Sequence, residues 1–131
     1  IEQGAKHVNQ KKSARIALGK WGEQAALEYL TGQGYQCLER NFRCLDGEID
    51  LVMLKDDELV FVEVKTRKNT RHSYPEEAVS DEKLEHMEAA VSCFLEKGED
   101  HDADWRFDVI AIVGTPATGI IDIQWYKDVH E

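Results

Sequence analysis

The sequence predicts one α/β domain in which helices pack against a single central sheet. The chain has 131 residues, a length typical of one compact domain, and no repeat or proline-rich linker divides it. Two segments have helical periodicity, and five are rich in β-branched residues or alternate as strands do. Their order, α-β-β-β-α-β-β, is typical of a mixed sheet flanked by helices.

The first helix is expected from residue 13 to about residue 31, and Gly32 and Gly34 are expected to end it. One face collects small or apolar side chains that suit close packing on a sheet. These are Leu18, Gly22, Ala25, Ala26 and Tyr29. Residues 1–12 are polar, and we expect them to form a flexible N-terminal segment ahead of a domain spanning residues 13–131.

The remaining elements follow from β-branched runs and capping residues. Strands are expected at residues 35–42, 48–54, 59–66, 106–113 and 120–126. Residues 67–77 are expected to form a loop. Ser80 is a candidate cap for a second helix that ends at Gly98. Its first turn carries Asp81 and Glu82, which suit the positive end of a helix dipole.

The net charge of −10 at first argues against a nucleic-acid partner, but the charge is unevenly distributed. Residues 1–75 contain 12 Lys and Arg against 11 Asp and Glu, a net charge of +1. Residues 76–131 contain 4 against 15, a net charge of −11. The densest basic run is residues 65–72. We therefore expect any affinity for nucleic acid to be local to one face.

Composition excludes two further classes. No apolar run approaches the roughly 20 residues that a transmembrane helix needs, so no membrane partner is expected. Cys37, Cys44 and Cys93 are odd in number and widely spaced, as expected for reduced thiols of a cytoplasmic protein. Neither these cysteines nor the histidines have the short spacing of a zinc site.

Charged residues in the second and third strands carry the strongest chemical signal. An antiparallel hairpin that closes at residues 56–57 places Asp50 opposite Glu63. It also places Glu48 opposite Lys65, with all four side chains on one largely apolar face. Since cross-strand Cβ atoms lie about 5 Å apart, two facing carboxylates would repel each other by roughly 3 kcal/mol.

A divalent cation would offset this repulsion. A few carboxylate oxygens suit Mg²⁺ or Mn²⁺, which keep several of their waters. The residue types alone leave a structural alternative open, in which Lys65 pairs with Glu48 or Glu63 at an exposed end of the sheet. On the same grounds Glu23 is a solvated helix residue and Lys83 a surface lysine.

Two resemblances strengthen the metal interpretation. Asp50, then twelve residues, then Glu63-Val64-Lys65, resembles the metal-binding motif of the PD-(D/E)XK nuclease superfamily, with Ile49 in place of its proline. Roughly residues 15–113 resemble the YraN family of uncharacterised bacterial proteins, described as similar to Holliday junction resolvases. The matching runs are residues 19–23, 34–35, 40–43, 47–52, 61–67, 75–79 and 106–109.

The resemblance implies a restriction-endonuclease-like core with a nuclease site. Asp50 and Glu63 would hold Mg²⁺ or Mn²⁺, and Glu23 would be a further ligand, directly or through water. Lys65 would position the attacking water or stabilise the charge that builds on the phosphate. At residues 72–74 the chain departs from the family pattern, which affects the expected shape of that loop and not the acidic centre.

Basic residues just beyond Lys65 are suitably placed to hold flanking phosphates. These are Arg67, Lys68 and Arg71, with Lys83 as a weaker candidate and Arg40 and Arg43 as extensions of the strip.

The favoured function is therefore an endonuclease that hydrolyses phosphodiester bonds in branched or structured DNA. The alternatives are a non-catalytic nucleic-acid-binding module that keeps the acids for structure, and a protein-interaction domain that uses the acidic second helix. Symmetric cutting of two strands would need a homodimer, and the role of Asp108 is left open.

Overall fold

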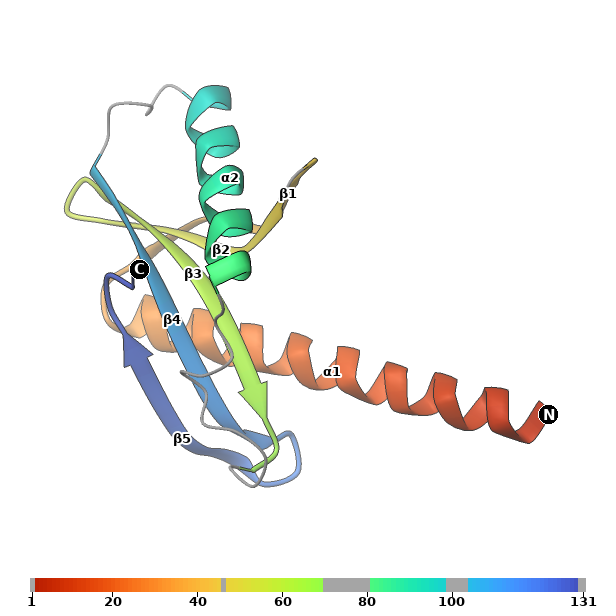
Figure 1. Ribbon diagram of the computed structural model, residues 1–131. Coiled ribbons are helices and arrows are strands. Elements are labelled where there is room, and N and C mark those ends of the chain that lie inside the picture. Colours follow the sequence, from red (N-terminus) through yellow and green to blue (C-terminus); the bar gives the residue numbers. More distant parts are fainter. Residues whose placement is uncertain (1, 46, 70–80, 99–103, 130–131) are drawn as a thin grey trace.

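The chain forms two helices and five strands within residues 2–45, 47–69, 81–98 and 104–129, which this computed structural model describes (Figure 1). In order they are α1 (Glu2–Gly32), β1 (Gln36–Cys44), β2 (Gly47–Lys55), β3 (Glu58–Arg67), α2 (Asp81–Lys97), β4 (Asp104–Thr115) and β5 (Gly119–Tyr126). The predicted order is confirmed, and every strand boundary lies within two residues of its expected position.

The first helix begins earlier than the sequence predicts. α1 starts at Glu2 rather than residue 13, and its N-terminal half projects beyond the sheet (Figure 1). No proline interrupts the polar segment, so the helical hydrogen-bond ladder can continue through it. The flexibility expected of residues 1–12 stays a prediction. Ser80 and residues 70–77 of the expected loop lie outside the described part of the chain.

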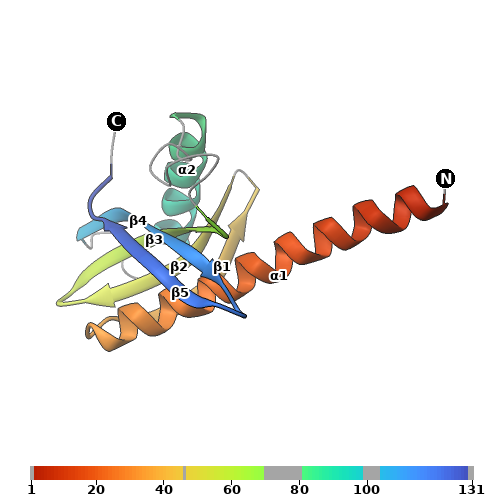
Figure 2. The same ribbon diagram turned by 90° about the horizontal axis from the view of Figure 1, so that it is seen from below.

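The strands form one sheet in the order β1-β2-β3-β4-β5. All neighbours are antiparallel except β3 and β4, which pair in parallel from Glu58↔Asp104 to Arg67↔Val113. Parallel neighbours need a crossover connection, and α2 lies on it. Figure 2 shows α1 crossing one face of the sheet while α2 stands on the other. No helix in the described ranges is long and apolar enough to cross a membrane.

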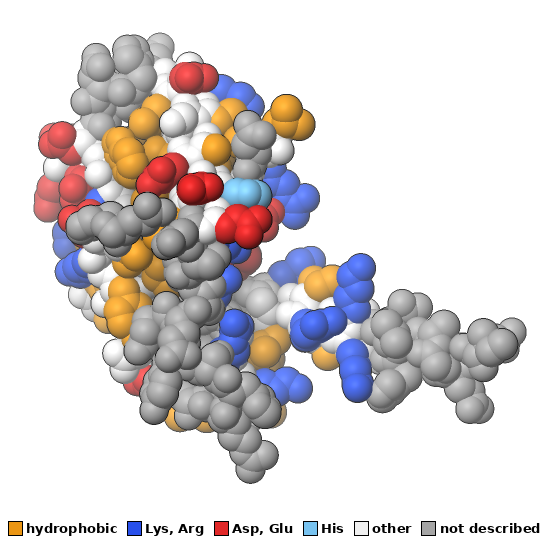
Figure 3. Space-filling view, in the orientation of Figure 1, with side chains coloured by type: hydrophobic (Ala, Val, Ile, Leu, Met, Phe, Trp, Pro, Cys, Tyr) orange, Lys and Arg blue, Asp and Glu red, His pale blue; other side chains and the backbone are white. Residues whose placement is uncertain are grey.

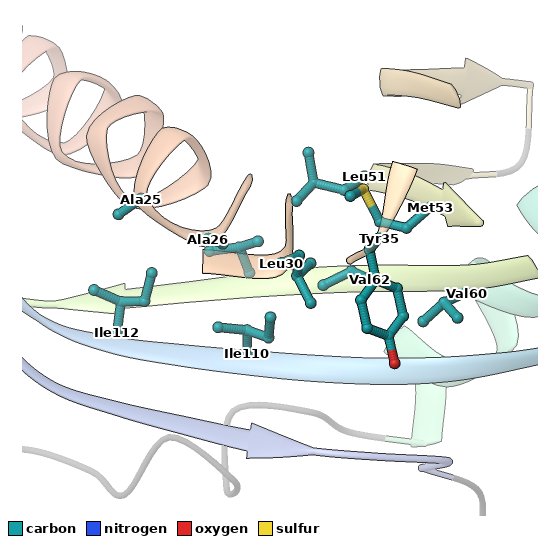
Figure 4. Packing of buried hydrophobic residues seen from close by; sticks show 11 residues of the cluster. Ala25, Ala26, Leu30, Tyr35, Leu51, Met53, Val60, Val62, Ile110 and Ile112 are labelled. Carbon is teal, nitrogen blue, oxygen red and sulfur yellow. The ribbon is translucent and has the colours of Figure 1, made fainter. Parts of the chain in front are cut away.

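A hydrophobic cluster fills the space between α1 and the sheet (Figure 4). Ala25, Ala26 and Leu30 of α1 pack against inward-facing side chains of the three central strands. These are Leu51, Met53, Val60, Val62, Val64, Ile110 and Ile112, with Tyr35 beside them. The small residues let α1 approach the sheet closely, as the sequence predicts for this face.

A second cluster fills the space between α2 and the opposite face of the sheet. Met87, Ala90 and Val91 of α2 pack there against buried strand residues. These are Phe42, Ile49, Val52, Leu59, Phe61 and Phe107. The ring of Phe94 meets Phe42 and Phe61 edge to face, with centroid separations of 5.3 and 5.6 Å. The sheet is therefore covered on both faces, and its central strands are buried.

The closest approach of α1 to the sheet occurs at Gly22. A Cβ atom at this position would overlap the side chain of Thr66 on β3. Gly19, almost one turn earlier, faces open space, and a Cβ atom there would have no neighbour within 4 Å. Because the next residue after Gly22 is Glu23, this contact also fixes where Glu23 lies relative to the end of β3.

The two glycines make a matched pair for testing this contact. Gly22→Ala should lower the free energy of unfolding by about 1–3 kcal/mol, because the new methyl group must push α1 away from Thr66. Gly19→Ala should be neutral or stabilising by up to about 1 kcal/mol, because alanine favours the helix and meets no neighbour. Urea denaturation measures both changes. Equal stability of the two variants would contradict this packing.

Candidate functional site

The ladder between β2 and β3 ends just before two acidic residues. The antiparallel register, which is the one predicted for the hairpin, reaches its last pair at Leu51 and Val62. Beyond it, Asp50 Oδ2 accepts a hydrogen bond of 2.8 Å from the backbone N–H of Val64. A side-chain carboxyl therefore takes the place of a backbone acceptor at the point where the strands separate, next to Glu63.

Strict alternation along β2 is interrupted at this point. Ile49 and Val52 both belong to the cluster on the α2 side, although they are three residues apart. Asp50, which lies between them, lines a cleft together with Gly19 and Glu23 of α1. The separation of β2 from β3 thus turns Asp50 toward an opening at the edge of the core.

The expected pairing of Glu48 with Lys65 is wrong. Glu48 lies opposite Arg43 of β1, and its Oε2 is 3.3 Å from Arg43 Nε, with both side chains exposed. Lys65 forms an ion pair with Glu63, which is one of the two partners that the structural alternative predicted for it. Because β2 has left β3 before it reaches Glu48, the side chain of Glu48 finds its partner on β1.

Glu63 is almost fully buried and carries two ion pairs. Its residue is only 4% exposed, and its Oε1 lies 3.1 Å from Lys65 Nζ and 2.9 Å from Lys83 Nζ. Lys65 is two residues further along β3, whereas Lys83 comes from the first turn of α2. Two ammonium groups on one oxygen offset the cost of burying this carboxylate.

Lys83 is thereby placed at the acidic centre and not on an open surface. Its side chain is 35% exposed. Burial lowers the pKa of Lys83, but the hydrogen bond and the charge of Glu63, together with the charge of Asp50, outweigh burial and leave the pKa raised. Lys83 therefore stays cationic across the neutral range.

Burial raises the pKa of Asp50 to about 8, and the nearby charge of Glu63 adds to the effect. The hydrogen bond from Val64 acts in the opposite direction, while a hydrogen bond with Glu63 favours the protonated form. Asp50 therefore holds its proton more tightly than an ordinary aspartate does, close to the Glu63 carboxyl group. This is the electrostatic conflict that the facing acids predict.

Glu23 approaches the same cleft from α1. Burial raises its pKa, the charges of Glu48 and Glu63 act in the same direction, and a hydrogen bond with Asn41 and the charge of Arg40 oppose them. No three His, Cys, Asp or Glu side chains of the described ranges are grouped closely enough to hold a metal ion. Glu23 therefore lies at the margin of the acidic pair, and its role through a water stays a prediction.

The acidic pair opens into a cleft of about 690 Å³ between α1 and the end of β3. Besides Glu23, Asp50 and Glu63, its lining contains several basic side chains. These are Arg15, Lys65, Arg67 and Lys68. Arg67 and Lys68 thus lie where the sequence places them, beside the acids. Arg71, the third residue of the predicted phosphate strip, lies outside the described residues.

Two residues around the acidic centre were missed by the sequence reasoning, Arg15 in the cleft and Asn41 in a neighbouring hollow. Arg15 lines the cleft one turn before Gly19 and two turns before Glu23, a spacing of four residues that would have revealed the shared helix face. Asn41, which bonds to Glu23, has a positive φ of 53° within β1. No sequence pattern signalled that backbone conformation.

Asp108 is the other fully buried acid, and its surroundings are structural. Its oxygens accept hydrogen bonds from Arg106 at 3.0 and 3.2 Å, from Trp125 at 2.8 Å and from the backbone of Asp128 at 3.0 Å. Arg106 also donates to Glu58 and, at 2.8 Å, to the hydroxyl of Tyr35. This network ties β4 to β5 and to the start of β1, and every polar partner of Asp108 in it comes from the fold itself.

The acidic pair suits a hard divalent cation by its donor chemistry. Asp50 and Glu63 offer carboxylate oxygens, and the charge of Glu63 helps to raise the pKa of Asp50. Mg²⁺ and Mn²⁺ are commonly bound by one or two carboxylates with water completing the shell. A set of two protein carboxylates is therefore sufficient, and histidine or cysteine is not required.

Fold and site together define a class. The chain is an α/β protein with a five-stranded mixed sheet covered by helices, compatible with a restriction-endonuclease-like fold, and its acids converge at the split between two central strands. A family model described as "Uncharacterised protein family UPF0102" matches residues 22–112. The chain belongs to the UPF0102 family, and this match confirms the resemblance to the YraN family.

Relatives in this family cover most of the chain. A UPF0102 protein of Syntrophomonas wolfei is 47% identical over 96 residues, which are 73% of this chain and 84% of the relative. A UPF0102 protein of Caldicellulosiruptor saccharolyticus is 36% identical over 111 residues, which are 85% of this chain and 94% of the relative. A UPF0102 protein of Herminiimonas arsenicoxydans is 42% identical over 120 residues, which are 92% of this chain and 91% of the relative.

The raised pKa of Asp50 predicts how Asp50→Asn affects stability. An acid with a folded-state pKa of about 8 and an ordinary value of 3.8 costs stability as the pH rises between these values. In the metal-free protein at neutral pH, Asp50→Asn should therefore raise the free energy of unfolding, by on the order of 1–3 kcal/mol. The amide still accepts from Val64 and donates to Glu63. Denaturation at a series of pH values measures the difference, which should shrink toward acid pH.

The second buried acid supplies the matched control. Asp108→Asn breaks the buried ion pair with Arg106 and sets an amide N–H among hydrogen-bond donors, so it should destabilise the protein by about 3–5 kcal/mol at neutral pH. Asp50 and Asp108 would then respond to the same substitution with opposite signs. Loss of stability in both variants would show that Asp50 belongs to a structural ion pair.

Proposed function

We propose that this protein is a metal-dependent endonuclease that hydrolyses phosphodiester bonds in branched or structured DNA. One observation carries the proposal. Asp50 and Glu63 converge at the mouth of an open cleft, with the ammonium groups of Lys65 and Lys83 on Glu63 and a basic lining beyond them. Carboxyl groups whose pKa values are shifted by burial and by neighbouring charges are typical of catalytic sites.

The chain's own residues supply three requirements of phosphodiester hydrolysis. Asp50 and Glu63 would hold Mg²⁺ or Mn²⁺, which supplies activation of a water molecule and neutralisation of phosphate charge. Lys65 lies on the cleft side of the pair, where its ammonium group orients a water or stabilises the charge that develops on the phosphate. Glu23 would hold a water from the α1 side.

Lys83 has a positioning role in this proposal. Its ion pair with Glu63 links the start of α2 to the acidic centre and places an ammonium group on the Glu63 carboxylate. Arg67 and Lys68 continue the cleft beyond Lys65, where flanking phosphates of a bound strand would lie. Recognition would therefore rest on the phosphate backbone and not on base edges.

A cleavage panel tests the proposed activity. Labelled single-stranded, duplex, flap and four-way DNA are incubated with Mg²⁺ or Mn²⁺ and separated on denaturing gels. We expect cleavage of a structured substrate that stops with chelator and falls by at least about 100-fold in Asp50→Asn and Lys65→Ala. Asp122→Asn, an exposed acid on β5, is the matched control and should retain activity. Sedimentation in parallel shows whether the active species is a homodimer.

A non-catalytic nucleic-acid-binding module is the second candidate, and one observation favours it. The two lysines on Glu63 offset its charge from within the fold itself. In that case the acids serve the fold, and the basic lining of the cleft serves binding alone.

Metal-dependent stability separates the two candidates. If the acidic pair binds Mn²⁺, saturating Mn²⁺ should raise the melting temperature of the wild type by several degrees. Asp50→Asn should lose this response, because the substitution removes an anionic ligand. Thermal melts with Mn²⁺ and with chelator make the comparison, with Ca²⁺ as a check on general ionic effects. No Mn²⁺ response in the wild type would favour the non-catalytic module.

A further inference from the structure

The projecting part of α1 has a charge pattern unlike the rest of the chain. Residues 10–22 contain four basic residues and no acidic residue, although the whole chain has a net charge of −10. The basic residues are Lys11, Lys12, Arg15 and Lys20. We call residues 10–20 the α1 arm.

The α1 arm is open to solvent. Every residue from 10 to 17 is exposed, and so is Lys20. The arm extends past the edge of the sheet (Figure 1), and Figure 3 shows basic side chains on several sides of it. In contrast, the helix residues from Gly22 to Leu30 that face the sheet are buried. The basic segment is thus the part of α1 that the fold itself does not use.

Helical spacing places basic side chains of the arm beside the candidate site on two adjoining faces of the helix. Lys11 and Arg15 are four residues apart, and Arg15 lines the cleft of Asp50 and Glu63. Lys12 and Lys20 lie on a neighbouring face, and Lys20 lines a second hollow. Both hollows contain Glu23 and Asp50.

The second hollow has a mixed lining of basic and acidic side chains. It has a volume of about 520 Å³, and Lys20, Asn41, Arg43 and Glu48 line it together with Glu23 and Asp50. The guanidinium group of Arg43 pairs with Glu48 there, so Lys20 is the basic side chain that the α1 arm supplies to this hollow. Basic residues of the arm therefore reach both hollows beside the acidic residues.

We propose that the α1 arm binds the phosphate backbone of the nucleic acid at a distance from the reacting phosphate. This inference rests on the proposed function and adds to it a second contact region. From Lys11 to Glu23 the helix rises about 18 Å, at about 1.5 Å per residue. At about 3.4 Å per base pair, this length reaches about five base pairs from the acidic pair. The substrate is therefore a duplex arm that continues beyond the cleft.

Charge and polarity favour this occupant over a membrane or a protein. A membrane-binding helix needs a wide apolar face, but Ile16 is the one large apolar side chain among the exposed residues 10–17. A packed protein interface would also need apolar anchors there. The closely spaced phosphates of a nucleic acid attract a helix segment that presents basic side chains on several sides and no acidic side chain.

The salt dependence of DNA binding tests the α1 arm. The double variant Lys11→Gln with Lys12→Gln removes two exposed cations that line neither hollow, and glutamine is a good helix former, so the fold should be unchanged. Fluorescence anisotropy with a labelled four-way junction and a duplex, in chelator and over a KCl series, gives the binding constant. We expect weaker binding and a slope of log K against log[KCl] that is reduced by about 2, or about 1 for each cation removed.

A matched control removes two lysines elsewhere. Lys97 ends α2 and Lys127 follows β5, and both are exposed and line neither the cleft nor the second hollow. Lys97→Gln with Lys127→Gln makes the same change in net charge, so a general electrostatic effect would weaken binding equally in both double variants. We expect the control to retain a slope close to that of the wild type.

Each other result overturns the inference. If the arm variant binds with wild-type affinity and slope, the arm does not contact DNA, while the proposed nuclease function still stands or falls on Asp50→Asn. If the wild type binds no nucleic acid, both proposals fail. If the arm variant changes the sedimentation of the free protein and leaves DNA binding intact, the arm contacts a second copy of the chain.

Discussion

The candidate site depends on one hydrogen bond, from the backbone N–H of Val64 to Asp50 Oδ2. Two buried central strands cannot separate without leaving backbone groups unpaired, and such groups cost free energy. The carboxyl of Asp50 satisfies the first donor beyond the end of the ladder. It can do so only by lying inside the core, beside Glu63, where burial raises its pKa. The opening in the sheet and the electrostatic conflict therefore have the same origin.

The other wall of the cleft depends on close packing of α1. Gly22 lets the helix approach Thr66, and the following residue, Glu23, is thereby carried to the margin of the acidic pair. The same helix axis then continues past the sheet as the basic α1 arm. One end of α1 packs on the sheet through small residues, and the basic residues before that end lie around the cleft. The packing of the core therefore determines where these charges lie.

The two deeply buried acids, Glu63 and Asp108, have different electrostatic surroundings in the same sheet. Asp108 accepts hydrogen bonds from Arg106, Trp125 and a backbone N–H, so its charge is balanced within the fold. Glu63 is paired with two lysines, but its charge also raises the pKa of Asp50 beside it. A satisfied network stabilises the fold, whereas buried groups with strongly shifted pKa values are more often found at functional sites.

The order of the elements and the hairpin register were predictable, because the alternation of strand residues and the turn at residues 56–57 are local signals. They bring Asp50 near Glu63 without further information. Glu48 was misplaced because the same alternation was extended past the point where β2 leaves β3, which depends on packing against both helices. Lys83 could not be assigned to Glu63, since 20 residues separate them and only the docking of α2 brings them together. Contacts within a hairpin are set by nearby chain, whereas contacts across layers are decided only when the whole core has packed.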